Sequence, residues 1–227
     1  MNLLRTLSSG AIKGHFGQWA EDVLVRKLFP KEKNSGFYLD LGAYHPFTHS
    51  NTAYFWLKGW CGVNVDANPN SIKLFQKHRP SDQNIWTAIV PESDVKAGNT
   101  RARLMLPTAK DAASGISATG TVHKETSLVR SMTETVDVPA TSVSRLLRDN
   151  NIRQIDYLNI DIEGHDEMII DDFPFSSCRP SVISIEDYPE SLADVLKSKI
   201  SENLFANDYI LVGRAGPTSI YVSKLNN

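Results

Sequence analysis

Residues 37–66 read FYLDLGAYHPFTHSNTAYFWLKGWCGVNVD, and this stretch decides the fold. It begins with a short apolar strand at 37–41 and continues through a glycine-containing turn. A helical stretch follows Ser50, a candidate N-cap, and a second apolar strand covers 62–66. The connection between the two strands is too long for a hairpin, so we expect the strands to be parallel, as in a βαβ unit.

The same alternation of strands and helices continues on both sides of this unit. We expect the further helices at 17–29, from Pro69 through Lys77, at 142–149, from Asp166 and at 191–204, and the further strands at 84–90, 157–162, 181–187, 208–214 and 218–224. Gly216 and Pro217 separate the last two strands and favour a hairpin. The sequence therefore predicts an α/β fold with a doubly wound, mainly parallel seven-stranded sheet and a C-terminal antiparallel hairpin.

Length and composition favour one domain over residues 1–227, with an N-terminal helical segment at 1–35. The 24 basic and 26 acidic residues leave a net charge of -2, which argues against a dedicated nucleic-acid-binding protein. No window approaches the roughly 20 apolar residues of a membrane span. We therefore expect a cytoplasmic protein without a membrane span, and we leave open whether it forms a homo-oligomer.

The segment 107–135 differs from the rest of the chain, because it is rich in Ser, Thr, Ala and Gly and shows no convincing period. We interpret it as a mobile loop or lid, with an ordered insertion as the alternative. The only cysteines, Cys61 and Cys178, lack the spacing of a zinc or redox site.

Polar residues follow several of the predicted strands, where open parallel sheets bind their ligands. After the first strand, Asp40 precedes Gly42 and Ala43, and a glycine there allows a ligand to approach the backbone. Asp66 ends the second strand, where an acid can bind both hydroxyls of an adenosine ribose. The first turn lacks the other glycines of a dinucleotide-binding motif, so these acids fit an adenosine ligand without phosphates.

The segment IDYLNIDIEGHDEM at 155–168 carries the strongest chemical signal. Asp161, Glu163 and His165 gather at one strand end, and Glu186 ends the neighbouring strand. Converging carboxylates repel one another unless a cation, a proton or a polyol ligand satisfies them. Tyr188, just beyond, is a candidate for substrate contact.

Three stretches resemble the FkbM-type methyltransferases, a family of the S-adenosylmethionine-dependent superfamily. They are FYLDLGAYHPFTHSNT, GWCGVNVDANP, and IDYLNIDIEGHDEMII followed by RPSVISIED, which together span about 36–187. The resemblance implies that Asp40 and Gly42 form the first cofactor motif, that Asp66 binds the ribose and that Asp161 lies beside the methyl group. It also implies methyl transfer to a hydroxyl of a sugar, polyketide or related small molecule.

Methyl transfer to a hydroxyl requires in-line alignment and removal of a proton. We expect His165 or His45 to accept that proton, because an imidazole pKa near 6.5 suits the task. A second hypothesis is that Asp161 and Glu186, with Glu163, hold a divalent cation that binds the acceptor hydroxyls. Without a metal, the same acids would bind a sugar directly.

Two other placements follow from fold geometry. Asn68 and the segment Asp82–Ile85 are expected to flank the adenine, and Arg79 is a candidate partner of Asp82. Two alternative functions stay open, a nucleotide- or dinucleotide-binding oxidoreductase and an inactive methyltransferase fold that only binds its ligand. The first would need a glycine-rich phosphate turn, which the chain lacks.

Overall fold

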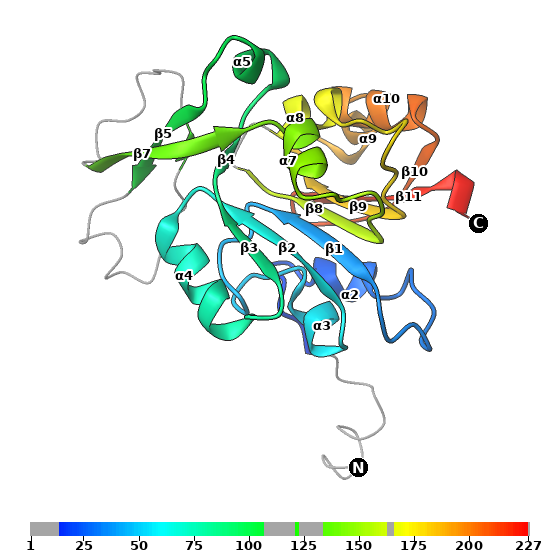
Figure 1. Ribbon diagram of the computed structural model, residues 1–227. Coiled ribbons are helices and arrows are strands. Elements are labelled where there is room, and N and C mark those ends of the chain that lie inside the picture. Colours follow the sequence, from blue (N-terminus) through cyan, green and yellow to red (C-terminus); the bar gives the residue numbers. More distant parts are fainter. Residues whose placement is uncertain (1–13, 107–120, 123–133, 163–165, 227) are drawn as a thin grey trace.

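A mainly parallel seven-stranded sheet lies between two layers of helices in the computed structural model, which describes residues 14–106, 121–122, 134–162 and 166–226 (Figure 1). Its strands, in spatial order, are β10 (Tyr209–Ala215), β11 (Thr218–Ser223), β9 (Val182–Glu186), β8 (Tyr157–Ile160), β1 (Phe37–Leu41), β2 (Cys61–Asp66) and β3 (Gln83–Trp86). Neighbouring strands from β9 to β3 are parallel, whereas β11 runs antiparallel to both β9 and β10. This arrangement confirms the predicted fold class, including the C-terminal hairpin.

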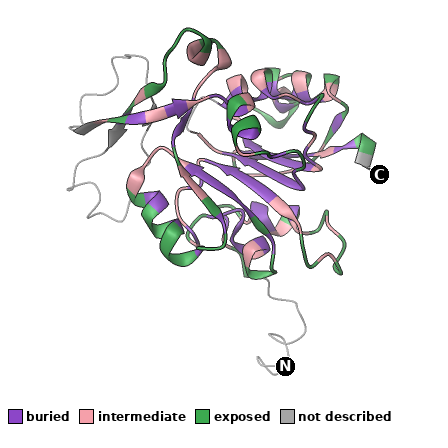
Figure 2. Cartoon of the chain, viewed as in Figure 1, coloured by how far each residue is buried: buried purple, intermediate pink, exposed green. Residues whose placement is uncertain are grey.

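Helices cover both faces of this sheet, and the side chains of each strand divide between them. The helices are α2 (Glu21–Val25), α3 (Ala53–Leu57), α4 (Pro69–His78), α5 (Glu92–Lys96), α7 (Val143–Asp149), α8 (Asp166–Asp172), α9 (Leu192–Val195) and α10 (Lys199–Ala206), with a terminal 3₁₀ turn η1 (Lys224–Asn226). On β1, Leu39 and Leu41 join the core shared with α7, α8 and α10. Tyr38 faces the other way and joins the core shared with α2 and α3. The central strands are therefore buried on both faces, as Figure 2 shows, which explains their continuous apolar runs.

The first and last predicted helices are shorter than their apolar patterns indicated. Only Glu21–Val25 of the predicted helix 17–29 is helical, because Ala20 adopts a left-handed conformation with φ 63°. The predicted helix 191–204 is divided into α9 and α10, since Ser198 caps a new helix by accepting from the amide of Ser201. In contrast, α4 begins at Pro69 as predicted, with the Asn68 side chain as its cap.

The prediction of Ser50 as an N-cap is wrong. Helix α3 begins at Ala53, after Thr52, and the Ser50 hydroxyl instead accepts a hydrogen bond from Arg79 at 3.0 Å. The Ser50 side chain, which the local pattern assigned to a helix cap, thus binds Arg79, a residue far along the chain.

A second, smaller sheet was not predicted. It contains β4 (Ala88–Ile89), β7 (Glu134–Thr141), β5 (Arg101–Leu106) and β6 (Thr121–Val122) in this spatial order. The predicted strand 84–90 is divided at Thr87, whose hydroxyl donates to the Pro139 carbonyl, so that β3 and β4 belong to different sheets. Most of the predicted loop 107–135 lies outside the described residues, but its described parts pair with β5.

None of the helices within the described ranges combines the length and the hydropathy needed to cross a bilayer.

Candidate functional site

The carboxyl ends of the parallel strands bring the predicted acids to one edge of the sheet. Along this edge, Glu186 ends β9, Asp161 follows β8, Gly42 follows β1 and Asp66 ends β2. These strands are adjacent in that order, so residues far apart in the sequence line one edge. The structure therefore places these four residues where an open parallel sheet binds its ligands.

The turn after β1 is held against both neighbouring strands. The amides of Gly42 and Ala43 both donate to the Val65 carbonyl of β2, at 2.9 and 3.0 Å. Gly42 has φ 80°, and a β-carbon there would lie 1.7 Å from the Asp161 carbonyl oxygen. We expected a ligand to approach the backbone closely at Gly42. On the side where a β-carbon would stand, the Asp161 carbonyl occupies this space instead.

Asp40 lies below this edge, with 1% of its surface exposed. Its carboxylate accepts a hydrogen bond from the Thr52 hydroxyl at 2.6 Å and another from the Asn159 amide at 2.9 Å. Burial raises its pKa, and the bonds from Thr52 and Asn159 lower it in part. Buried and doubly bonded, the carboxylate supports the β1 turn from beneath.

Arg79 closes this polar network from the end of α4 and is completely buried. It donates to Thr52 at 2.9 Å, to Ser50 and to the Pro46 carbonyl. The Asp82 amide donates to the Arg79 carbonyl at 3.1 Å, but the side chains of the two residues pair only indirectly. The Tyr38 hydroxyl lies between them, accepting from Arg79 at 3.4 Å and donating to Asp82.

Asp66 is partly exposed and bridges two loops of the candidate site. Its carboxylate accepts from the amide of Tyr44 at 2.7 Å and from the amide of Asn68 at 2.6 Å. Burial, together with the nearby charge of Asp40, raises the pKa of Asp66 to about 6, although the two backbone hydrogen bonds lower it. Its protonation therefore changes between pH 5 and 7.

His45 is fixed within the turn by its own ring. Its Nδ1 accepts the amides of Phe47 at 3.1 Å and Thr48 at 3.0 Å, which places the ring proton of the neutral form on Nε2. Burial lowers its pKa, as do the nearby charges of His78, Arg79 and His49. Since the lone pair needed by a general base is already engaged, this geometry favours a role in shaping the turn.

Trp86 is an exposed residue of this edge that the sequence analysis missed. It ends β3 opposite Asp66, is 41% exposed, and donates from its indole nitrogen to the Ala67 carbonyl at 2.9 Å.

The expected placement of Asp82 beside the adenine is wrong, because Asp82 precedes β3 and accepts the amide of Gly62 at the amino end of β2. Asp82 and Trp86 lie at opposite ends of β3. Only the pairing of β3 with β2 shows that Trp86, and not Asp82, lies beside Asp66.

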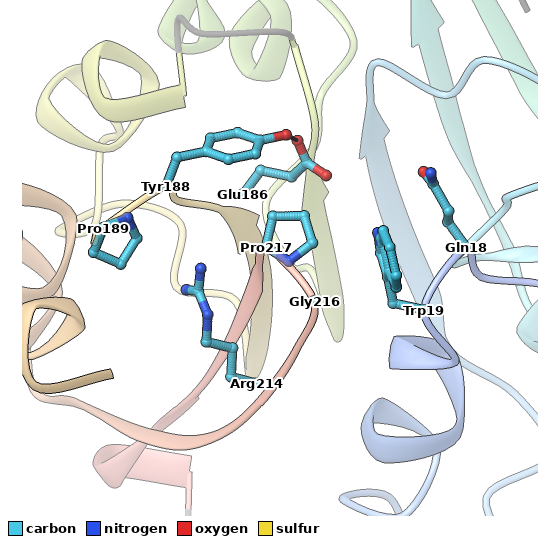
Figure 3. Close-up of a pocket in the computed structure, with 8 residues that line it drawn as sticks. All are labelled: Gln18, Trp19, Glu186, Tyr188, Pro189, Arg214, Gly216 and Pro217. Carbon is cyan, nitrogen blue, oxygen red and sulfur yellow. Dashed lines mark hydrogen bonds between the residues drawn. The ribbon is translucent and has the colours of Figure 1, made fainter. Parts of the chain in front are cut away.

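Glu186 and Tyr188 line a pocket of about 490 Å³ at the end of β9 (Figure 3). The Tyr188 hydroxyl donates to the Glu186 carboxylate, and 71% of Tyr188 is exposed. Asp161 begins the loop after β8, beside this strand, and is partly exposed. The predicted substrate contacts Glu186 and Tyr188 thus share one cavity.

Glu163, Gly164 and His165 lie outside the described residues, so the predicted roles of Glu163 and His165 stay predictions. Among the residues that are described, no three of histidine, cysteine, aspartate and glutamate gather closely enough to hold a metal ion. The predicted cation at Asp161 and Glu186 therefore finds no support.

Comparison with known proteins identifies the family of this chain. The chain is similar to a TehB-like SAM-dependent methyltransferase from Corynebacterium glutamicum of known structure, with 11% identity and a TM-score of 0.43 over 97% of this chain and 94% of that one. No curated protein sequence matches the chain. The family model for the methyltransferase FkbM domain matches residues 40–208, from the β1 acid to the residue before β10. The chain therefore belongs to the FkbM methyltransferase family.

Proposed function

We propose that this protein transfers the methyl group of S-adenosylmethionine to a hydroxyl oxygen of a small molecule. The family implies this cofactor. The observation that carries the proposal is Asp66, a partly exposed acid at the end of β2 that is fixed by two backbone amides. An acid at this position of such a sheet can accept both hydroxyls of a ribose.

The residues around Asp66 fit the rest of an adenosine. The Trp86 indole is 41% exposed and its nitrogen donates to the Ala67 carbonyl, so the adenine can stack on this ring. Asn68 directs its side-chain oxygen to the amide of Asn70, which leaves its amide nitrogen as the group for a ligand. The β1 turn, with the buried Asp40 beneath it, separates this half of the site from Asp161.

The acceptor half of the proposed site lies toward β8 and β9. When bound, S-adenosylmethionine would supply a sulfonium methyl group. The acceptor oxygen would bond to the methyl carbon in line with the breaking carbon–sulfur bond, whose electrons would leave with the sulfur of S-adenosylhomocysteine. The chain must then hold the hydroxyl in line and take its proton. Glu186 offers a carboxylate at this end, and His165 is the other candidate base.

Calorimetric titration with S-adenosylhomocysteine tests the cofactor half of the proposal. We expect micromolar binding to the wild type and a loss of about 10- to 100-fold in Asp66→Ala, since hydrogen bonds to a charged group are removed. Asp149→Ala is the matched control, because Asp149 is an exposed acid on α7 and its replacement should not change the affinity. No binding to the wild type, or tighter binding of NAD, would contradict the proposal and favour the oxidoreductase. Cofactor binding without transfer to any hydroxyl acceptor would favour the inactive fold.

The raised pKa of Asp66 also predicts how cofactor affinity depends on pH. Below pH 6 the carboxyl group is mostly protonated and loses one of its acceptor positions, whereas above pH 6 it is ionised and accepts both ribose hydroxyls. At pH 5 about a tenth of the protein is in the ionised form, so the Kd for S-adenosylhomocysteine should be about tenfold higher than at pH 7 and level above that. Asp66→Asn should show a flat profile between pH 5 and 7. An unchanged slope in this variant would assign the titration to another group.

A further inference from the structure

The pocket at the end of β9 is closed on one side by a segment that precedes the first described helix. Three parts of the chain line it: Gln18 and Trp19 before α2, Glu186, Tyr188 and Pro189 after β9, and Arg214, Gly216 and Pro217 at the β10–β11 turn (Figure 3). The residues before α2 lie outside every motif of the sequence analysis, and they bring a tryptophan to the acceptor side of the candidate site.

Two buried acids hold this segment in place. Glu21 and Asp22 are 3% and 0% exposed, and their carboxylates accept the amides of the four consecutive residues 16–19. The shortest of these bonds, 2.6 Å, joins the Trp19 amide to Glu21. Carboxylates that accept backbone amides make strong hydrogen bonds, so the segment is fixed before any ligand arrives.

The backbone is strained at the residue that joins this segment to α2. Ala20, directly after Trp19, has φ 63°, a left-handed conformation that is unfavourable for a residue with a side chain. Such strain persists only where the surroundings impose it, and it gathers at binding sites. Here its effect is to turn the chain sharply between Trp19 and α2.

The Trp19 ring is held at the rim of the pocket while one side stays accessible. It is 54% exposed, and it packs against Gly216 so closely that a β-carbon there would lie 2.5 Å from the ring. On the inner side, a β-carbon at Gly17 would lie 2.6 Å from the side-chain oxygen of Asn51, whose amide donates to Asn159 of β8 at 3.1 Å. The segment is therefore packed on both sides, and the indole forms a fixed wall of the pocket.

The lining combines flat apolar surfaces with a polar edge. Trp19 and the two prolines supply the apolar surfaces, while Glu186 and Gln18 supply acceptors and donors for hydroxyl groups. Arg214 joins the hairpin to the end of β9, because its guanidinium donates to Ser219 and to the Asp187 carbonyl. A pyranose ring has the matching division, since its faces carry C–H groups and its edge carries hydroxyls.

We propose that this pocket binds the methyl acceptor as a sugar ring, with a ring face against Trp19 and neighbouring hydroxyls donating to Glu186. The inference rests on the proposed function, because it gives the acceptor hydroxyl its site. Glu21 and Asp22 are then positioning residues, which act on the ligand through the segment that carries Trp19. An open-chain polyketide hydroxyl would gain less from a flat indole wall, because it has no rigid ring face to place against it.

Ligand-observed NMR titration of methyl α-glucopyranoside and methyl α-rhamnopyranoside, with and without saturating S-adenosylhomocysteine, tests this inference. We expect at least one glycoside to bind, and Trp19→Ala to weaken it about tenfold while the affinity for S-adenosylhomocysteine stays unchanged. Trp19→Phe should restore most of the affinity, and Glu186→Gln should weaken it by a similar factor. Trp86→Ala is the reciprocal control, since it should weaken the cofactor and leave the glycoside unaffected.

The outcomes separate this inference from the proposed function. A wild-type protein that binds S-adenosylhomocysteine but neither glycoside would overturn the sugar pocket and leave the proposed function standing. Equal glycoside binding by Trp19→Ala, or tighter binding of 2,4-pentanediol as an open-chain 1,3-diol, would overturn it as well. Failure to bind S-adenosylhomocysteine would contradict the proposed function, while the titration without cofactor would still test the pocket alone.

Discussion

Arg79→Met should destabilise the protein by about 3–5 kcal/mol, the usual cost of removing one member of a buried charged network. The guanidinium is completely buried and donates to Thr52, Ser50 and the Pro46 carbonyl. Methionine would fill much of the space but would leave these acceptors without their donor. It would also remove the positive charge that lowers the pKa of Asp40. The loss should appear as a lower urea midpoint with an unchanged m-value.

Arg148→Met provides a matched control for this prediction. Arg148 lies on α7 with 68% of its side chain exposed, and its ion pair with Asp149 is a surface contact. Such pairs contribute little, so the control should change stability by less than about 0.5 kcal/mol. A loss below about 1 kcal/mol in Arg79→Met would mean that the network contributes to the shape of the β1 turn without stabilising the fold.

Gly42→Ala should cost about 2–5 kcal/mol, from two separate causes. A left-handed backbone with φ 80° costs a residue with a β-carbon about 1–2 kcal/mol. The β-carbon would also lie 1.7 Å from the Asp161 carbonyl oxygen, and that oxygen belongs to backbone that cannot rotate away. Relief requires the β1 and β8 ends to separate, so affinity for S-adenosylhomocysteine should fall together with the urea midpoint.

Gly98→Ala separates these two causes. Gly98 has a similar φ of 89°, but nothing lies within 4 Å of the position of its β-carbon. It should lose only the conformational part, about 1–2 kcal/mol, and should keep its affinity for the cofactor product. Equal losses in the two variants would show that the β1 turn accommodates the methyl group, and that the approach of Asp161 to Gly42 is not a constraint on the site.

The family and the sheet were accessible from the sequence because both depend on local patterns. Apolar strands followed by acids recur at residues 37–41, 62–66 and 157–162, and connections of this length impose parallel pairing. The start of α4 was equally local, since a proline and the preceding asparagine define it. Of the acids predicted from the strand ends, Asp66, Asp161 and Glu186 do lie at one edge.

The second sheet escaped prediction for a physical reason. Strand β7 pairs with β5 across a long intervening segment, and no periodicity within either strand reports a partner so far away. The same limit applied to Trp19, which belongs to no motif and reaches the pocket only because Glu21 and Asp22 fix the segment before α2.

The sequence by itself determined the family, the alternation of strands and helices that builds the main sheet, and which acids end its strands. Only the tertiary structure decided what each acid does. Asp40 and Asp66 look equivalent at their strand ends, yet Asp40 is buried under Asn159, 119 positions later, whereas Asp66 stays partly exposed beside Tyr44. Strand formation depends on neighbours a few residues apart, while burial, pKa and access to a ligand depend on groups that meet only when the chain has folded.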